Sequence, residues 1–239
     1  MGRRAGRRGR GQQVTREGTR VAADWKQPDF AQSWARDDSM RNLLDFPRRM
    51  AAVIVAGDNP HPACIADIAS GPGDVLAAFL GQFPAARGIW TDASQAMLEL
   101  AQERLAPFGD RVEYHIADMT DITADIVPAG VDVITTSRAT HHLDRAGLAG
   151  FYARAASLLA PGGWLVNLDH IGPDDIWDSR LRAARKHFGT GPEKATHHHT
   201  YPLTSMRDHL DGYASAGITD VEVVWRAFYT CLFMGRRGG

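Results

Sequence analysis

The sequence predicts an α/β protein in which helices cover both faces of a mostly parallel sheet. Two observations carry this prediction. Beyond the Asn-Pro-His-Pro break at 59–62, short apolar runs alternate with segments of helical periodicity, as in consecutive strand–helix units. Residues 65–74 pass from an apolar strand through a glycine turn into a helix. The length of 239 residues suits one domain with a single core, so a second full domain is not expected.

The first 22 residues differ in composition from the rest of the chain. Residues 1–20 contain seven arginines and one acid, a net charge of +6, which leaves 20 basic and 27 acidic residues in the remainder. Residues 2–11 are almost all Arg and Gly and cannot bury apolar surface, so 1–22 is expected to be a disordered leader. Arginine clusters attract phosphate, which makes a nucleic-acid-binding tail the alternative. The acidic remainder would repel nucleic acid and favours the solvated leader.

An N-terminal helical cap is expected over 24–56, where apolar residues recur mostly every three to five positions. Pro28 and Pro47 are expected to divide this cap into short helices. Three aromatic side chains of the cap either pack its helices together or close over a ligand. They are Trp25, Phe30 and Trp34.

Beyond the break, each apolar run and each helical period gives one expected element. The strands are 63–69, 88–91, 112–116, 131–136 and 164–168, and the helices are 75–83, 95–105 and 145–159. The last of these helices ends before Pro-Gly-Gly at 161–163, a strong stop signal. Residues 170–203 break the rhythm with a short helix near 174–188 and a polar loop, and a small lid insertion is expected there. A helix at 205–216 and strands at 219–225 and 228–234 follow.

The segment 65–74, Ile-Ala-Asp-Ile-Ala-Ser-Gly-Pro-Gly-Asp, predicts a cofactor site. Its glycines allow close approach of the backbone to a ligand, and the helix that follows offers N–H donors. In an open parallel sheet this crevice is where ligands bind. The next strand ends at Asp92, nineteen residues after Gly73, where a carboxylate can accept hydrogen bonds from both hydroxyls of a ribose.

A glycine turn followed by an acid also describes NAD-binding oxidoreductases. Their fingerprint requires a third glycine, and Leu76 occupies that position here. Asp67, inside the first strand, also argues for a different cofactor. An NAD-dependent enzyme is therefore kept only as a distant alternative.

Five motifs in order resemble those of class I S-adenosylmethionine (SAM)-dependent methyltransferases of the small-molecule type. In chain order they are Asp67…Gly71-Pro72-Gly73, then Asp92-Ala93-Ser94…Met97-Leu98…Ala101, then Ala117-Asp118-Met119, then Val131-Asp132-Val133-Ile134 with His141-His142-Leu143, and finally Leu159-Ala160-Pro161-Gly162-Gly163. The resemblance covers roughly residues 40–235. It implies a Rossmann-like domain over 23–239, with seven strands of which the last is antiparallel.

The resemblance also implies roles for individual residues. Gly71 and Gly73 are expected to pass close to the amino-acid part of SAM, Asp92 to hold the ribose, and Asp118 with Met119 to frame the adenine. Further cofactor contacts are expected from the residues around these motifs. They are Asp67, Ala69, Ala93, Met97 and Ser137.

Histidines follow the strands whose ends would face the methyl acceptor. Methyl transfer from SAM is an in-line displacement, so the protein mainly positions the acceptor and removes its proton. His142 is the first choice of general base because a polar residue after the fourth strand often faces the substrate in this family, and His170 ends the fifth strand. The alternative is that His141 or His142 only caps the next helix or binds backbone. The His-His-His run at 197–199 lies in the expected lid, and its alternative is a solvated loop.

A more specific hypothesis joins three of these histidines in a metal site. His142, His170 and one residue of 197–199, taken as His198, would bind Zn, Fe or Ni, with Asp169 as a further ligand or a partner of one. A metal of this kind would suit a chelating substrate such as an α-keto acid or a catechol. With a keto acid, the metal would acidify the neighbouring C–H, so that the enolate takes the methyl group.

Arg138 stands between the fourth strand and the histidine pair. It either pairs with a substrate carboxylate or bridges to an acid such as Asp144. The expected catalytic set is therefore His142, His170 and Arg138.

These observations predict a SAM-dependent methyltransferase acting on a small-molecule metabolite, with metal-assisted C-methylation as its most specific form. The alternatives are a metal-independent O- or N-methyltransferase with a histidine base, an RNA methyltransferase using the Arg-rich tail, and a SAM-binding regulatory protein without transfer activity. The sequence contains neither an apolar run long enough for a membrane span nor a signal peptide pattern. Cys64 and Cys231 are expected to be small core residues in a reducing compartment, which predicts a cytoplasmic protein. No pattern indicates the oligomeric state.

Overall fold

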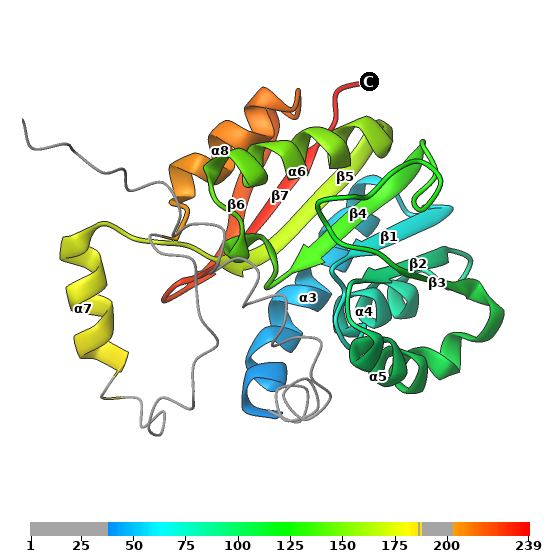
Figure 1. The fold of residues 1–239 in the computed structure, drawn as a ribbon, viewed down its shortest axis with the longest axis horizontal. Coiled ribbons are helices and arrows are strands. Elements are labelled where there is room, and N and C mark those ends of the chain that lie inside the picture. The colour runs from blue at the N-terminus through cyan, green and yellow to red at the C-terminus, as the bar shows by residue number, and fades with distance from the viewer. Residues whose placement is uncertain (1–37, 186, 188–202) are drawn as a thin grey trace, which may run out of the picture.

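The computed structural model describes residues 38–185, 187 and 203–239, and these build one seven-stranded sheet (Figure 1). The strands are β1 (Cys64–Ile68), β2 (Arg87–Asp92), β3 (Val112–Ile116), β4 (Val131–Ser137), β5 (Leu159–His170), β6 (Asp220–Ala227) and β7 (Thr230–Arg236). Their order across the sheet is β3-β2-β1-β4-β5-β7-β6. The pairs from β3 to β5 are parallel, whereas β7 pairs antiparallel with both β5 and β6. The expected sheet, with its last strand antiparallel, is confirmed.

Helices lie on both faces of this sheet, as expected. They are α3 (Asp38–Asp58), α4 (Asp74–Gln82), α5 (Gln95–Leu105), α6 (Arg145–Leu158), α7 (Asp175–Arg185) and α8 (Met206–Ser215), with short 3-10 turns η1 (Ala106–Arg111) and η2 (Thr140–His142).

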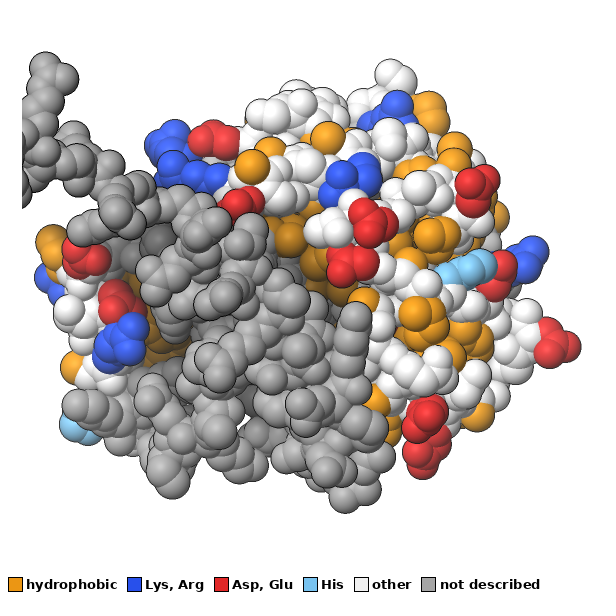
Figure 2. Space-filling model, in the orientation of Figure 1, with side chains coloured by type: hydrophobic (Ala, Val, Ile, Leu, Met, Phe, Trp, Pro, Cys, Tyr) orange, Lys and Arg blue, Asp and Glu red, His pale blue; other side chains and the backbone are white. Residues whose placement is uncertain are grey.

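Acidic and basic side chains are interspersed over the described part of the face shown in Figure 2. Within the described residues, no helix combines the length and apolar character needed to cross a lipid bilayer.

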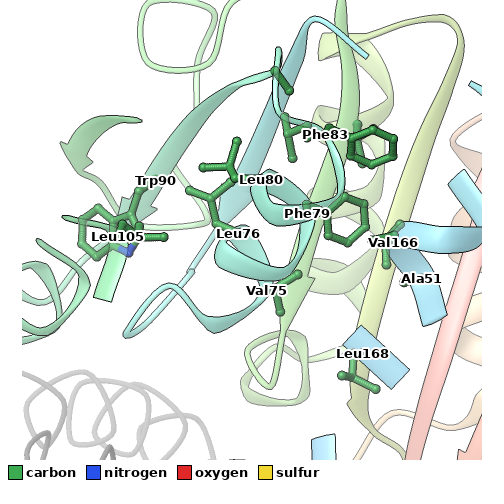
Figure 3. Packing of buried hydrophobic residues seen from close by; sticks show 14 of the residues in the cluster. Ala51, Val75, Leu76, Phe79, Leu80, Phe83, Trp90, Leu105, Val166 and Leu168 are labelled. Carbon is green, nitrogen blue, oxygen red and sulfur yellow. The ribbon is translucent and has the colours of Figure 1, made fainter. Parts of the chain in front are cut away.

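Two buried apolar clusters, one on each face of the sheet, form the core. The first joins α3, α4 and α5 to the sheet through side chains such as Ala51, Phe79 and Leu105 (Figure 3). The second joins α6 and α8 to the opposite face through Phe151 and Tyr213. Burial of each large apolar side chain contributes about 1.5–3 kcal/mol, so the sheet and both helical layers stabilise one another.

The prediction that Pro47 divides the N-terminal cap is wrong. Pro47 lies inside α3, which continues from Asp38 to Asp58. A proline in a helix interior costs about 3 kcal/mol because it removes one backbone hydrogen bond and clashes with the preceding turn. The buried side of α3, including Leu44 and Val55, outweighs that cost by packing against α4 and the sheet. Residues 1–37, with the predicted leader, Pro28 and the three aromatic residues, lie outside the described part of the chain.

The expected lid insertion is described only in part. The helix predicted near 174–188 is present as α7, which lies at one side of the sheet (Figure 1). Tyr229, between β6 and β7, contacts α7 through a hydrogen bond from its hydroxyl to Asp178 Oδ1 at 2.9 Å. Residues 186 and 188–202 are not described, so the role of this insertion as a lid stays a prediction.

Replacing Gly212 by alanine is expected to destabilise the protein. Gly212 lies inside α8, and a Cβ atom there would be 2.4 Å from Cδ2 of Tyr152 on α6. Such overpacking costs about 1–3 kcal/mol, more than the ~1 kcal/mol that alanine gains in helix propensity. Gly81 in α4 is the matched control, because a Cβ there meets nothing within 4 Å. Urea unfolding should show a loss for Gly212→Ala and no loss for Gly81→Ala; equal midpoints would contradict the close contact between α6 and α8.

Candidate active site

The turn after β1 requires glycine at two positions. Gly71 and Gly73 have φ angles of 56° and 85°, in the left-handed region. A Cβ atom at Gly73 would also lie 2.8 Å from Cδ1 of Leu105 on α5. The Sδ atom of Met97 lies 4.0 Å from the Cβ position of Gly71, so α5 supports the turn from beneath. Ala69 adopts a φ angle of 53°, which side chains rarely tolerate and which is typical of functional turns.

Asp67 is buried below this turn and holds it in place. Its Oδ1 accepts a hydrogen bond from Thr135 Oγ1 at 2.7 Å, and its Oδ2 accepts one from Ser70 Oγ at 2.5 Å. Burial raises the pKa of Asp67 to about 6, although hydrogen bonds from Ser70, Thr135 and the Leu76 backbone oppose the shift. The structure therefore gives Asp67 a role in shaping the turn, and its direct contact with a cofactor stays a prediction.

The raised pKa of Asp67 gives a test of its burial. Between about pH 4 and pH 6 the folded protein retains a proton that the unfolded chain has lost, so stability falls as the pH rises through this window. This difference in pKa between the folded and unfolded protein corresponds to about 3 kcal/mol. In Asp67→Asn this fall should be absent. Unfolding free energies at pH 4 and pH 7 for both proteins give the difference, and parallel pH profiles would show that Asp67 is not buried as a carboxylate.

Asp92, at the end of β2, fits the role of a ribose ligand. Its Oδ2 accepts a hydrogen bond from the Gly71 N–H and its Oδ1 accepts one from the Ser94 N–H, each at 2.9 Å. A carboxylate has about four acceptor positions, so each oxygen can still accept a hydroxyl. Burial raises the pKa of Asp92, while these backbone donors lower it. Trp90 Nε1 also donates to the Gly71 carbonyl at 2.8 Å, so the glycine turn is fixed from two sides.

The remaining predicted cofactor residues lie at the same edge of the sheet. Asp118 follows β3, and the N–H of the preceding residue, Ala117, donates to the Asp92 backbone carbonyl at 3.0 Å. Oδ1 of Asp118 accepts hydrogen bonds from the backbone and hydroxyl of Thr120 at 2.8 and 2.7 Å. Met119 is half-buried against the second core cluster. Ser137 ends β4, and its buried Oγ has no hydrogen-bond partner among the described residues.

The most constrained pair in the site, Asp169 and His141, was not predicted from the sequence. Asp169 is the last but one residue of β5 and is fully buried, and its Oδ1 lies 2.6 Å from His141 Nδ1. Its Oδ2 accepts hydrogen bonds from the backbone N–H groups of Ala139 and His141 and from Thr140 Oγ1. Burial alone would raise the pKa of Asp169, but His141, with smaller contributions from His170 and Thr140, holds that pKa well below its usual range. The Asp-His pair at 169–170 and the His-His pair at 141–142 were the only sequence signals.

The two histidines predicted as catalytic both lie beside His141. The ring of His142 is 4.0 Å from the ring of His141 between centroids, and the ring of His170 is 5.3 Å away. Thr230 Oγ1 lies 3.0 Å from His170 Nδ1. The side chain of Asp144 caps α6 by accepting from the Gly147 N–H. Asp144 thus provides a side-chain cap of this helix, and the alternative that His141 or His142 only caps it or binds backbone stays a prediction.

Arg138 lies between this cluster and the end of β4. Its φ angle of 55° is strained for a residue with a side chain, and its N–H donates to the Leu168 carbonyl at 2.9 Å. The side chain is half-buried at the same sheet edge. Its pairing with a substrate carboxylate stays a prediction.

The predicted metal site is only partly within the described residues. His142 and His170 both lie beside His141, whereas His198 belongs to the part that is not described. Among the described residues, no three His, Cys, Asp or Glu side chains are grouped as a metal ion requires. Asp169, the predicted supporting ligand, instead accepts hydrogen bonds from the turn and from His141. The metal site stays a prediction.

Comparison with known proteins finds similarity to methyltransferases. Residues 65–163 match the family model of a methyltransferase domain, a stretch that includes the glycine turn, Asp92 and His142. The trans-aconitate 2-methyltransferase of Acidovorax sp. (strain JS42) is 35% identical over 122 residues, 51% of this chain and 44% of that protein. The 3-amino-4-hydroxybenzoate 4-O-methyltransferase of Streptomyces cremeus is 33% identical over 108 residues, 45% and 28% of the two chains. This chain thus spans less than half the length of either relative.

A solved structure shows the same fold. The magnesium protoporphyrin IX methyltransferase of Synechocystis PCC 6803, with S-adenosylhomocysteine (SAH) bound, superposes with a TM-score of 0.63 at 16% identity. The match covers 93% of this chain and 100% of that one.

Proposed function

We propose that this chain, whose residues 65–163 match a methyltransferase-domain family, is a class I SAM-dependent methyltransferase that transfers the methyl group of SAM to a small carboxylic acid. One observation carries the proposal. The glycine turn and Asp92, at the ends of β1 and β2, share a sheet edge with Arg138 and the histidines at the ends of β4 and β5. Because β1 pairs directly with β4, a cofactor on the turn would lie next to an acceptor beside the histidines.

The residues at this edge fit SAM. Gly71 and Gly73 give the turn the left-handed backbone that lets it approach a ligand closely, and Asp92 retains acceptor positions for two hydroxyls. When bound, SAM supplies an electrophilic methyl group on a sulfonium. The protein then has to exclude water, orient the acceptor and accept its proton.

His142 is proposed as the general base because it follows β4 at the edge shared with the glycine turn, whereas His141 is only 1% exposed and is paired with Asp169. His141 is instead a positioning residue. An ionised Asp169 can only accept hydrogen bonds, so His141 Nδ1 must carry the proton that lies between them. This fixes the tautomer and orientation of the ring against which His142 packs. The negative charge of Asp169 would also stabilise the imidazolium that forms as His142 takes the proton.

The substrate class follows from Arg138 and from the names of the relatives. Arginine binds carboxylates through paired, charge-assisted hydrogen bonds. Both trans-aconitate and 3-amino-4-hydroxybenzoate are small carboxylic acids, which supports an acceptor whose carboxylate pairs with Arg138. Metal-assisted C-methylation is a second candidate, supported by the approach of both His142 and His170 to His141.

Methyl transfer from tritium-labelled SAM tests the proposal. The full chain would be incubated with a panel of small carboxylic acids, simple phenols and total RNA, with and without a chelator. We expect label in at least one carboxylic acid and a product heavier by one CH₂ group. Label in RNA alone would contradict it, as would SAH binding without transfer to any acceptor. Loss of transfer on chelation, restored by Zn, Fe or Ni, would favour the metal-assisted form.

A further inference from the structure

A hydrogen-bonded chain of buried polar side chains runs from Asp169 in the candidate active site to the start of α8. It joins residues of η2, β5, α6 and α8 and ends at a threonine that precedes α8. In spatial order they are Asp169, Thr140, Asn167, Tyr152, His209 and Thr204, each at most 4% exposed. Asn167 Nδ2 lies 3.0 Å from Thr140 Oγ1 and 2.8 Å from the Tyr152 hydroxyl. Nδ1 of His209 lies 2.7 Å from the same hydroxyl, and its Nε2 lies 3.2 Å from Thr204 Oγ1.

Chemistry allows one direction of donation along this chain. The Asp169 carboxylate can only accept, so Thr140 donates its single proton to Oδ2 at 2.6 Å. Thr140 Oγ1 must then accept from Asn167, which fixes the orientation of that amide. The other proton of the Asn167 amide goes to the Tyr152 oxygen.

The far half of the chain follows the same direction. Tyr152 accepts from Asn167 and therefore donates its own proton to His209 Nδ1. His209 then carries its proton on Nε2 and donates it to Thr204. This order needs a neutral His209, because a proton on Nδ1 would face the Tyr152 hydroxyl and leave that hydroxyl without its acceptor. Burial lowers the pKa of His209 to about 4, although the charges of Asp169 and Asp208 oppose the shift.

We propose that Asn167, Tyr152 and His209 are positioning residues that hold the Thr140 hydroxyl on Asp169, and thereby keep His141 donating through Nδ1. The hydrogen-bond order stands on the buried contacts alone, and its effect on turnover rests on the proposed methyltransferase activity. The Thr140 and Tyr152 hydroxyls each donate once and accept once, so removal of a central member takes away a contact that restrains its neighbour. Without the contact from Asn167, the bond to Asp169 alone would hold the Thr140 hydroxyl in place.

Tyr152→Phe is the direct test because it removes one oxygen from the middle of the chain. Tyr213→Phe is the matched control. Tyr213 is also fully buried, its ring lies 4.5 Å from that of Tyr152, and its hydroxyl bonds to the carbonyls of Leu165 and Phe233 outside the chain. His209→Leu removes the acceptor of the Tyr152 hydroxyl, whereas His209→Gln can restore one through its amide oxygen. The comparison of His209→Leu with His209→Gln provides the test if Tyr152→Phe does not fold.

Two readouts separate positioning from packing. Proton NMR of the full chain should show the downfield ring N–H shared by His141 and Asp169 in the wild type, in Tyr213→Phe and in His209→Gln. This signal should shift or broaden in Tyr152→Phe and His209→Leu. With an accepted substrate, those two variants should lower kcat roughly 10-fold and shift the pH–rate profile, with the KM for SAM unchanged.

The NMR signal is independent of turnover, so it tests the hydrogen-bonded chain of side chains even if no acceptor is methylated. Equal spectra for Tyr152→Phe and Tyr213→Phe would overturn the proposal, as would an unchanged ring N–H in Tyr152→Phe. Absence of this signal from the wild type would also overturn it.

Discussion

Asp169→Asn is expected to lower methyl transfer at least about 100-fold, because the ring of His141 loses the acceptor that fixes its tautomer. An asparagine presents one oxygen and one NH₂ group, and Asp169 now accepts from three N–H groups and one hydroxyl in addition to its contact with His141. Some of these buried donors must lose their partner. The protein should also be destabilised by about 2–4 kcal/mol.

The effect on chemistry can be separated from the effect on stability with Asp132→Asn. Asp132 also accepts two backbone N–H groups, from Ala63 and Cys64 at 2.8 and 3.0 Å, but it lies at the opposite end of β4. We expect Asp132→Asn to lose stability while its kcat stays near the wild-type value. Single-turnover assays under conditions where all three proteins are folded give the comparison. Full turnover in Asp169→Asn would remove the Asp169–His141 pair from the mechanism.

The second large effect is expected at Asp92. In Asp92→Ala, SAH should bind roughly 100-fold more weakly, because hydrogen bonds from two ribose hydroxyls to a charged acceptor are lost. Part of this loss would come from the glycine turn, since Asp92 also accepts from the Gly71 N–H. Isothermal titration calorimetry measures the affinity directly.

Ser94→Ala is the control for this segment. The Ser94 side chain caps α5 and its backbone N–H, which alanine retains, donates to Asp92. The variant should lose about 1 kcal/mol of stability through the lost cap and keep its affinity for SAH. Equal affinities of wild type and Asp92→Ala would place the cofactor away from this carboxylate.

Local sequence patterns predicted most of the sheet, because each strand and each helix carries its own periodicity. The glycine turn was predictable for a similar reason. Positive φ angles favour glycine, so the backbone conformation at Gly71 and Gly73 can be inferred from the residue type alone. The predicted helix break at Pro47 was wrong, because the local rule that proline ends a helix does not include the tertiary packing that keeps α3 continuous. Tertiary contacts, which no local pattern records, overrode the helix-breaking tendency there.

The site was predictable as a set of sheet-edge residues and not as a network. His141 and Asp169 are separated by 28 residues, and their contact depends on the pairing of β4 with β5 and on the η2 turn. Tyr152 and His209 occupy ordinary buried positions on α6 and α8, and only the packing of those helices joins them to Asn167. The neighbouring histidines in the sequence indicated where the site lies, whereas the role of each histidine ring could be assigned only from the side-chain geometry.

A crystal structure of the full chain with SAH tests the central claim most directly. We expect both ribose hydroxyls on the Asp92 carboxylate, the amino-acid end of the ligand over Gly71 and Gly73, and the sulfur facing His142. Density for SAH elsewhere on the molecule, or a sulfur directed away from the histidines at the ends of β4 and β5, would contradict the proposed methyl transfer at this edge.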